Sequence, residues 1–331
     1  MTTDLNERST PVLWADLDAL DANISTMASA WPGTTLRPHV KAHKTTELAR
    51  RQAANGHTAF TCATPREVVG MAAAGLGDDL LLANETVDPT RLRAMAELDT
   101  PVTVAVDSEA TVDAAAAAGI TRVLVDIRVG FRCGCDVDDA GRLADRARAA
   151  DMEVRGVMGY EGHAMGQVDA TRRKRLVDGA MERLAAAHAL VGGDIVSGGG
   201  TGTWTDNTTV TELQAGSYVL MDTAYTEQGH PFRQGLFVES TVVSVSPDYA
   251  VLDAGLKSLG MDHGNPKVLG AEVMYCSDEH TNVIPETPLS VGDRVTLVPA
   301  HIDPTMAKHE ELVVVRDRQV VDVWPIDLRH W

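Results

Sequence analysis

The sequence has no apolar run long enough to span a lipid bilayer. Its first nine residues are polar and lack the apolar core of a secretory signal. Thiols are scarce: the 331 residues contain only Cys62, Cys133, Cys135 and Cys276, too few for a disulfide framework in a chain of this length. We therefore expect a cytoplasmic protein with reduced cysteines. The Cys133–Cys135 pair has no second cysteine pair near it, which argues against a zinc knuckle.

Basic residues are also few. The chain has 29 lysines and arginines against 47 acidic residues, which gives a net charge of -18. This balance argues against nucleic acids and anionic membranes as partners, and we expect a small-molecule partner instead. With 44% hydrophobic residues the chain can bury a large core, and its length suggests one large and one smaller domain.

Against this acidic background, residues 37–44 form a basic cluster with two lysines, two histidines and one arginine. The cluster follows a strand-like segment and precedes a helical pattern over Thr45–Asn55. A lysine flanked by other cationic groups loses its proton more readily, and the free amine can attack a carbonyl to form a Schiff base. Lys41 is the candidate for this role. The alternative is a solvated basic turn.

Strand-like and alanine-rich helical runs alternate over most of the chain. The rhythm predicts a parallel (β/α)₈ TIM-type barrel, an α/β fold, over residues 17–232. An open, doubly wound sheet is the alternative. The eight expected strands lie near Leu36–Val40, Ala59–Cys62, Leu80–Ala83, Val102–Val106, Val123–Ile127, Val154–Met158, Ile195–Ser197 and Tyr218–Met221.

After residue 232 short strand-like runs follow one another without helices. They predict an all-β domain over residues 233–331, which the N-terminal strand 10–16 could join. This domain carries His301 and Asp303, two positions apart. On an extended chain two such side chains point the same way, so they could share a divalent cation.

Residues after the predicted strands carry further chemistry, because a barrel of this kind has its active site at the C-terminal ends of the strands. Arg132 can meet an anionic oxygen, while Tyr160 offers an aromatic face and His163 a titratable imidazole. The glycine-rich segments Gly198–Thr203 and Gln214–Tyr218 suit a phosphate. A phosphate site combined with a Schiff-base lysine indicates pyridoxal 5′-phosphate (PLP).

These motifs together resemble the D-threonine aldolases and the eukaryotic-type D-serine dehydratases. Members of this family are fold-type III PLP enzymes with an alanine-racemase-like barrel and a C-terminal β domain. The resemblance covers nearly the whole chain. It rests on Thr10-Pro11, the cluster at 37–44, Tyr160–His163, Gly198–Thr203, Gln214–Tyr218, Asp253–Lys257, Glu279-His280 and the His301/Asp303 pair.

The resemblance implies a role for each candidate residue. Lys41 would hold PLP through a Schiff base, and Arg132 would contact the polar edge of the pyridine ring. His301 and Asp303 would bind a divalent metal, with manganese expected first and magnesium or zinc as alternatives. The cofactor-binding set is Lys41, Arg132, Tyr160, Gly200, Thr201, Gly202, Gly216, Ser217 and Tyr218.

The implied reaction is aldol cleavage of a D-β-hydroxy-α-amino acid to glycine and an aldehyde. The metal would bind the β-hydroxyl, and His163 would accept its proton. Dehydratases of the family typically carry cysteine where this chain has Asp303, so the aspartate favours an aldolase. Two positions depart from the family pattern: Thr281 follows His280 in place of glycine, and Ala63 replaces a glutamine expected at the cofactor.

Three alternatives remain: a lyase of the same family that acts on D-serine or D-3-hydroxyaspartate, a non-catalytic PLP carrier, and a racemase. The carriers resemble the barrel alone, and a racemase would need no metal pair. The resemblance also implies a homodimer.

Overall fold

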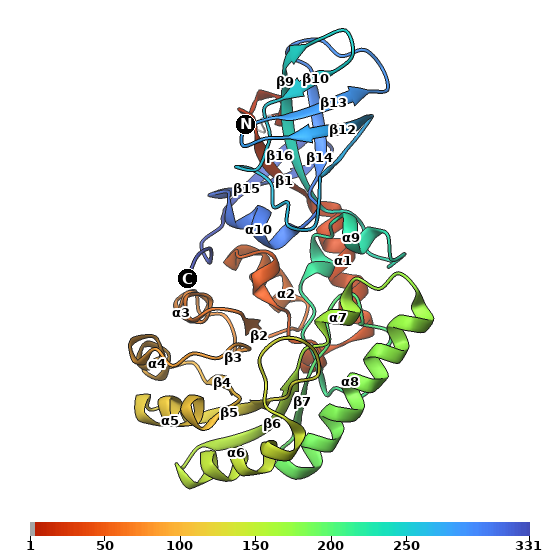
Figure 1. Ribbon diagram of the computed structural model, residues 1–331. Helices are drawn as coiled ribbons and strands as arrows, with labels where there is room; N and C mark the ends of the chain where they lie inside the picture. The colour runs from red at the N-terminus through yellow and green to blue at the C-terminus, as the bar shows by residue number, and fades with distance from the viewer. Residues whose placement is uncertain (1–3) are drawn as a thin grey trace. The chain divides into compact units, whose positions relative to one another are not determined.

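The computed structural model describes residues 4–331, which fall into two units (Figure 1). The barrel unit comprises Met27–Lys41, Leu48–Gly216 and His330–Trp331. The β unit comprises the described residues up to Thr26 together with Ala42–Glu47 and Ser217–Arg329. The predicted domain ranges, 17–232 and 233–331 with 10–16, stay predictions. No helix within residues 4–331 has the length and apolar character needed to cross a membrane.

In the described part of the barrel unit, seven parallel strands pair in the order of the sequence. Their centres are apolar and buried, as is typical of parallel strands with covered faces. The predicted α/β barrel is thereby confirmed. The strands are β2 (Ala59–Cys62), β3 (Asp79–Leu82), β4 (Val102–Val106), β5 (Arg122–Asp126), β6 (Glu153–Gly159), β7 (Ile195–Gly198) and β8 (Glu212–Leu213).

The extended segment 36–39 closes this sheet. Leu36 forms a parallel bridge to Leu213 in β8, and His39 forms one to Thr61 in β2. The first predicted strand is therefore reduced to isolated bridges, and Val40–Ala42 already turns as a 3-10 helix, η3.

The eighth predicted strand, Tyr218–Met221, is wrong. The pairing strand is the shorter β8, whereas Ser217–Val219 forms a 3-10 helix, η4. All four residues of this apolar run are buried, and a short buried apolar run has the same sequence pattern whether or not it forms a strand.

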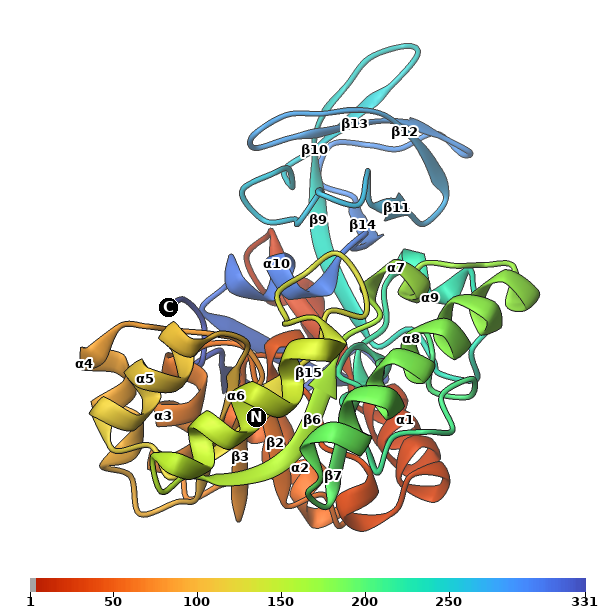
Figure 2. The same cartoon turned by 60° about the horizontal axis from the view of Figure 1, so that its bottom comes forward.

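Helices alternate with the strands and lie on the outside of the sheet (Figure 1). The helix starts are set by capping residues. Thr64 precedes the helix that begins at Pro65, and its side chain accepts the N–H of Glu67. Ser108 and Thr111 form a reciprocal capping box at the start of the helix that begins at Glu109. The helices are α2 (Thr46–Ala54), α3 (Pro65–Ala73), α4 (Pro89–Ala96), α5 (Glu109–Ala118), α6 (Val137–Ala149), α7 (Gly162–Met165) and α8 (Ala170–Val191); the long α8 packs on β6 and α6 (Figure 2).

A buried ion network lies at the start of the barrel strands. Arg37 donates from Nε to Glu212 Oε1 at 2.9 Å and from Nη2 to Asp79 Oδ2 at 2.8 Å. Arg155 reaches the same Asp79 oxygen at 2.6 Å and Thr103 Oγ1 at 2.8 Å. Burial acts to raise the pKa of Asp79, but Arg37 and Arg155 outweigh it, and the pKa lies below its ordinary value. Arg37, the first residue of the basic cluster, is thus a structural ion-pair partner.

The described β unit contains one nine-stranded sheet, in the order β10-β13-β12-β11-β14-β9-β1-β15-β16. An additional β9–β10 pairing closes six of these strands into an antiparallel barrel, so the predicted all-β region is confirmed. The strands are β1 (Val12–Asp16), β9 (Leu236–Val245), β10 (Ala250–Leu252), β11 (Lys267–Val268), β12 (Ala271–Cys276), β13 (Thr281–Pro285), β14 (Arg294–Val298), β15 (Glu311–Arg316) and β16 (Gln319–Pro325).

The helical elements of the β unit are few and mostly short. A 3-10 helix, η1 (Leu5–Glu7), precedes β1, and α9 (Thr223–Thr226) precedes β9. The helix α10 (Ile302–Ala307) lies between β14 and β15. Helix α1 (Leu17–Ala30) begins in the β unit, and after it the 3-10 helix η2 (Gly33–Thr35) leads into the closing segment of the barrel unit.

Candidate active site

Lys41 lies at the carboxyl end of the segment that closes the barrel, two residues after the bridge of His39. Its Nζ is 5.5 Å from the ring centroid of Tyr160, which follows β6. Both side chains are half-buried. The structure therefore brings the predicted Schiff-base lysine and the predicted aromatic residue together at the C-terminal ends of the strands.

Lys44, the other lysine of the basic cluster, has a structural contact. Its Nζ donates to the backbone oxygen of Asp303 at 2.9 Å, and its backbone has a positive φ of 53°. The backbone oxygen of Lys44 in turn accepts the N–H of Leu328. These contacts lie within the β unit and anchor the segment 42–47, so they favour Lys41 as the reactive amine.

The glycine-rich loop after β7 packs closely on α7. A Cβ at Gly200 would lie 2.9 Å from the sulfur of Met165, and one at Gly202 only 2.3 Å from the backbone oxygen of Met165. Gly199 has a positive φ of 76°. Glycine is thus required at positions 200 and 202 by the close approach of α7.

Glu161 anchors the loop after β7 through three hydrogen bonds. The buried carboxylate accepts the N–H of Gly199 at 3.2 Å, the hydroxyl of Thr203 at 2.8 Å and the Nδ2 of Asn207 at 3.3 Å. A carboxylate without exposure needs such partners. The sequence alone indicates no role for Glu161, since its partners lie 38 to 46 residues away.

Two backbone donors in the loops after β7 and β8 are suited to a phosphate. The N–H groups of Gly202 and Gly216, both buried residues, donate to no acceptor among residues 4–331. The second loop is held in register by Gln214, whose N–H donates to the Gly198 oxygen and whose Nε2 donates to Ser197 Oγ. Because buried N–H groups are rarely left unpaired, these donors fit the oxygens of a PLP phosphate.

Arg132 contacts a buried carboxyl group. Its Nη2 lies 2.9 Å from Asp126 Oδ2, and its Nη1 donates to the Ala83 oxygen at 3.3 Å. Burial, and then the charge of Glu85, raise the pKa of Asp126 well above its usual range, while Arg132 opposes them. The Arg132 side chain remains 36% exposed. Its predicted contact with the pyridine ring stays a prediction.

His163, in α7, lies near Tyr160 on the same rim. Its Nδ1 is buried and has no hydrogen-bond partner within the described chain. The imidazole meets the ring of Phe131 edge-on, with centroids 5.8 Å apart, and Phe131 is 96% exposed. The unpaired nitrogen faces Gly130, where a Cβ would lie 3.0 Å from it.

Ser217 and Tyr218 belong to the β unit and begin η4. The Tyr218 ring is fully buried and packs against Phe232, with centroids 5.6 Å apart. Only the backbone of Tyr218 could therefore contact a phosphate.

The predicted metal pair lies at the start of α10 in the β unit. His301 precedes the helix and Asp303 is in its first turn, so the expectation of an extended chain at this point is wrong. The pair nevertheless converges: His301 Nε2 lies 3.6 Å from Asp303 Oδ2. Two ligand atoms about 2.1 Å from one cation in tetrahedral geometry lie about 3.4 Å apart, so the donor set fits a divalent metal.

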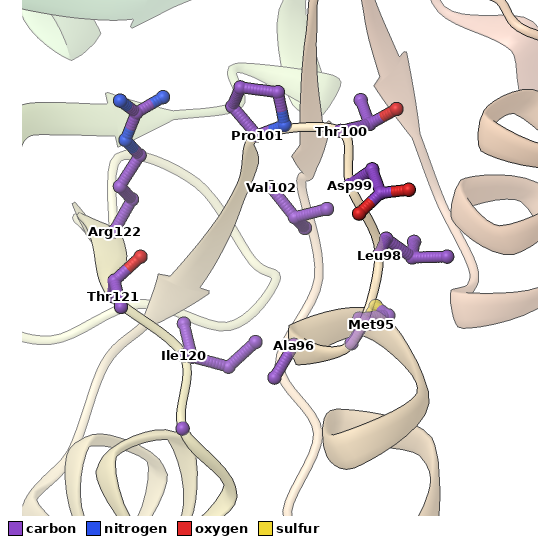
Figure 3. Close-up of a pocket in the computed structure, with 11 residues that line it drawn as sticks. Met95, Ala96, Leu98, Asp99, Thr100, Pro101, Val102, Ile120, Thr121 and Arg122 are labelled. Atoms are coloured by element: carbon purple, nitrogen blue, oxygen red, sulfur yellow. The ribbon is translucent and has the colours of Figure 1, made fainter.

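A pocket of about 240 Å³ lies at the opposite end of the barrel, where β4 and β5 begin (Figure 3). Its lining includes Asp99, Pro101 and Arg122. It contains none of the candidate residues, and active sites of parallel barrels lie at the other end. The pocket is therefore not part of the candidate active site.

Family models match both regions of the chain. The model described as alanine racemase, N-terminal domain, matches residues 15–224. The model described as putative serine dehydratase domain matches residues 235–315.

Individual proteins are similar over more of the chain. A D-threonine aldolase of Arthrobacter sp is 37% identical over 97% of this chain and 92% of its own length. A 3-hydroxy-D-aspartate aldolase of Paracoccus denitrificans is 35% identical over 98% of this chain and 93% of its own. A D-threo-3-hydroxyaspartate dehydratase of Delftia sp. is 30% identical over 78% of this chain and 74% of its own.

The crystal structure of D-threonine aldolase from Filomicrobium marinum superposes with a TM-score of 0.94 at 33% identity and covers 99% of this chain and 97% of the other. The barrel with its lysine, the second domain and these similarities agree. The chain belongs to the family of PLP-dependent fold-type III enzymes that joins an alanine-racemase-type barrel to a serine-dehydratase-type β domain and includes the D-threonine aldolases.

Proposed function

We propose that the protein is a PLP- and divalent-metal-dependent lyase that cleaves D-β-hydroxy-α-amino acids of the D-threonine type to glycine and an aldehyde. The observation that carries this proposal is the carboxylate of Asp303, 3.6 Å from His301 Nε2. The dehydratases of the family typically have a cysteine thiol at this position. The similarity to D-threonine aldolase and 3-hydroxy-D-aspartate aldolase supports the same choice.

PLP would be held at both sides of the barrel mouth. Lys41 would supply the amine, and Tyr160 an aromatic face beside it. The unpaired N–H groups of Gly202 and Gly216 would donate to the phosphate. Gly200, Thr201, Ser217, the backbone of Tyr218 and the guanidinium of Arg132 complete the proposed set. When bound, PLP supplies an electron sink for the charge left at Cα.

The cation would be held by His301 Nε2 and the carboxylate of Asp303. A bound divalent metal lowers the pKa of a hydroxyl that coordinates it. Both donors are partly buried, with side chains 23% and 18% exposed, so a cation here remains accessible to a small ligand. Nitrogen and carboxylate donors suit manganese, with magnesium and zinc as alternatives.

His163 is the proposed base for the proton of the β-hydroxyl. Its Nδ1 has no partner in the described residues, so it can accept a proton without breaking a hydrogen bond. The exposed ring of Phe131 lies edge-on to the imidazole. Arg132, fixed by Asp126 and the Ala83 oxygen, supplies a fixed positive charge on the same rim.

The second candidate is a dehydratase-type lyase, and the similarity to D-threo-3-hydroxyaspartate dehydratase favours it over a racemase. A non-catalytic PLP carrier fits less well, since the chain also has the β unit with its His301/Asp303 pair. We further propose that the protein is cytoplasmic and forms a homodimer. Light scattering of the purified protein will test the dimer. All four thiols are unpaired within the chain, consistent with a reducing compartment.

Product analysis with D-threonine and Mn²⁺ tests the function. We expect acetaldehyde and glycine in equal amounts, and no turnover of L-threonine. Formation of 2-oxobutyrate with ammonia would establish the dehydratase instead, and no product with any D-β-hydroxy amino acid would favour the carrier. D-phenylserine and D-3-hydroxyaspartate, tested in parallel, rank the side chains that the enzyme accepts.

A further inference from the structure

A second carboxylate touches the proposed cation site without being one of its predicted ligands. Asp262 Oδ2 lies 2.7 Å from His301 Nδ1, on the opposite side of the imidazole from Asp303. His263, the next residue, stacks on the His301 ring with centroids 3.9 Å apart and an angle of 6° between the planes. His301 is therefore held at one edge and over one face.

The loop that carries Asp262 is itself fixed against α10. Gly260 forms an antiparallel bridge to His301, and its N–H donates to Thr305 Oγ1 at 2.9 Å. The Thr305 hydroxyl donates to the His301 backbone oxygen at 2.7 Å. A Cβ at Gly260 would lie 2.3 Å from Pro304, so the approach requires glycine. Asp262 is thus placed only two residues after a backbone bridge to His301.

The contact determines which nitrogen of His301 can bind a metal. An ionised carboxylate only accepts hydrogen bonds, so the Nδ1 that it contacts must carry the hydrogen. The lone pair is then on Nε2, the nitrogen that faces Asp303. Histidines that bind metals commonly donate their other ring N–H to a carboxylate, which fixes both the tautomer and the ring orientation.

Asp262, His263 and His301 could also be read as three ligands of one ion, because their donor atoms lie within 4.8 Å of one another. The geometry opposes this. The two imidazoles are nearly parallel, so their in-plane lone pairs do not converge on one point. In addition, His301 Nδ1 lies 2.7 Å from Asp262 Oδ2, which is a hydrogen-bond distance and is shorter than the distance of about 3.4 Å between two ligand atoms of one tetrahedral cation.

We propose that Asp262 is a positioning residue for a divalent cation bound by His301 Nε2 and Asp303, and that it acts through the tautomer and orientation of His301. This inference rests on the cation site of the proposed function. Loss of such a carboxylate typically weakens metal binding about 10–100-fold. Loss of the Asp262 carboxylate should leave PLP binding in the barrel unit unchanged.

The test is a Mn²⁺ titration of the full-length, PLP-loaded protein, with free Mn²⁺ followed by electron paramagnetic resonance. The variants are Asp262→Ala, Asp262→Asn and His301→Ala. Asp248→Asn is the matched control, because Asp248 is an exposed aspartate of the same unit and loses the same charge. Thermal unfolding without metal and the PLP absorbance verify that each variant folds.

We expect His301→Ala to abolish binding at the site and Asp262→Ala to raise the Kd of Mn²⁺ about 10–100-fold. Asp262→Asn should fall between wild type and Asp262→Ala, since its amide oxygen can still accept the Nδ1 hydrogen. Unchanged affinity in Asp262→Ala, with binding lost in His301→Ala, would overturn the inference and leave the cation site intact. Unchanged affinity in His301→Ala would overturn both. An equal loss of Mn²⁺ affinity in Asp248→Asn would show that the effect of Asp262 comes from net charge alone.

Discussion

The two ends of the parallel barrel differ in how their polar groups are paired. Where the strands begin, Arg37, Asp79, Arg155 and Glu212 form ion pairs of 2.6–2.9 Å. Where the strands end, the N–H groups of Gly202 and Gly216 and the Nδ1 of His163 have no partner among residues 4–331. At the first end the charged groups pair with one another, and among their buried side-chain atoms only Oδ1 of Asp79 lacks a hydrogen bond within the described chain. At the second end these unpaired groups are backbone and imidazole nitrogens.

We infer that the polar groups at the strand starts stabilise the fold, whereas those at the strand ends bind a ligand. A buried polar group without a partner costs about 1–3 kcal/mol, so a cluster of them is retained where a ligand supplies the missing hydrogen bonds. The paired charges at the other end need no ligand. Substitutions at the strand ends should therefore change cofactor binding and turnover, and those at the strand starts should change unfolding.

The largest effect is expected for Lys41→Ala. Loss of the amine that holds PLP should lower turnover by about 10⁴-fold or more and remove the absorbance of the cofactor–lysine linkage. Spectra and steady-state rates measure both. Lys44→Ala is the matched control, because the Lys44 amine is occupied by the Asp303 oxygen, and it should retain the absorbance. Loss of absorbance in Lys44→Ala alone would reverse the assignment.

At the other end, Asp79→Asn should destabilise the protein by about 3–5 kcal/mol, since it leaves the buried Arg37 and the partly buried Arg155 without their shared carboxylate. Urea unfolding measures the change. The folded variant should bind PLP as the wild type does. A cost below about 1 kcal/mol, or a selective loss of PLP, would break the proposed division between the two ends.

A smaller and more selective effect is expected for Glu161→Gln. Because Glu161 holds Gly199 and Thr203 of the glycine-rich loop, the variant should weaken PLP about 10-fold, the equivalent of one hydrogen bond, and pyridoxal much less. Equilibrium titrations of the apoprotein with both compounds give the ratio. Glu182→Gln, on the exposed face of α8, serves as the control. An equal loss for PLP and pyridoxal would show that Glu161 acts on folding and not on the phosphate site.

The smallest effect is in pH dependence. Burial raises the pKa of Asp79, but Arg37 and Arg155 lower it by more. The pKa in the folded protein is therefore below its value in the unfolded chain. The folded state thus binds this proton less tightly. The stabilisation is present above about pH 4, the ordinary range of an aspartate, and is lost as the pH falls through the folded pKa. The difference in unfolding free energy between wild type and Asp79→Asn should shrink below about pH 4; a constant difference would contradict the ion-pair explanation.

Much of the fold could be predicted because each buried strand is a short apolar run between helices with their own capping residues. The strand β8 could not, because it has two residues and one of them, Glu212, is a buried charge that pairs with Arg37. A two-residue length and a charged residue do not produce the apolar pattern by which a buried strand is predicted. The apolar residues just after it, Tyr218–Met221, carried the signal instead.

The candidate site shows the same limit. Lys41, His163 and the two glycine-rich loops could be proposed from the sequence because their residue types are unusual at the ends of strands. The contacts that hold them could not: Glu161 meets its loop 38 or more residues away, and Asp262 meets His301 39 residues away. Such partners are ordinary acidic residues in an acidic chain, and only the fold selects them.

The most direct test of the account is to reduce the PLP-loaded protein with borohydride, digest it and locate the modified peptide by mass spectrometry. The account predicts a single phosphopyridoxyl group on Lys41. Modification of Lys44, or of no lysine in residues 37–44, would contradict it.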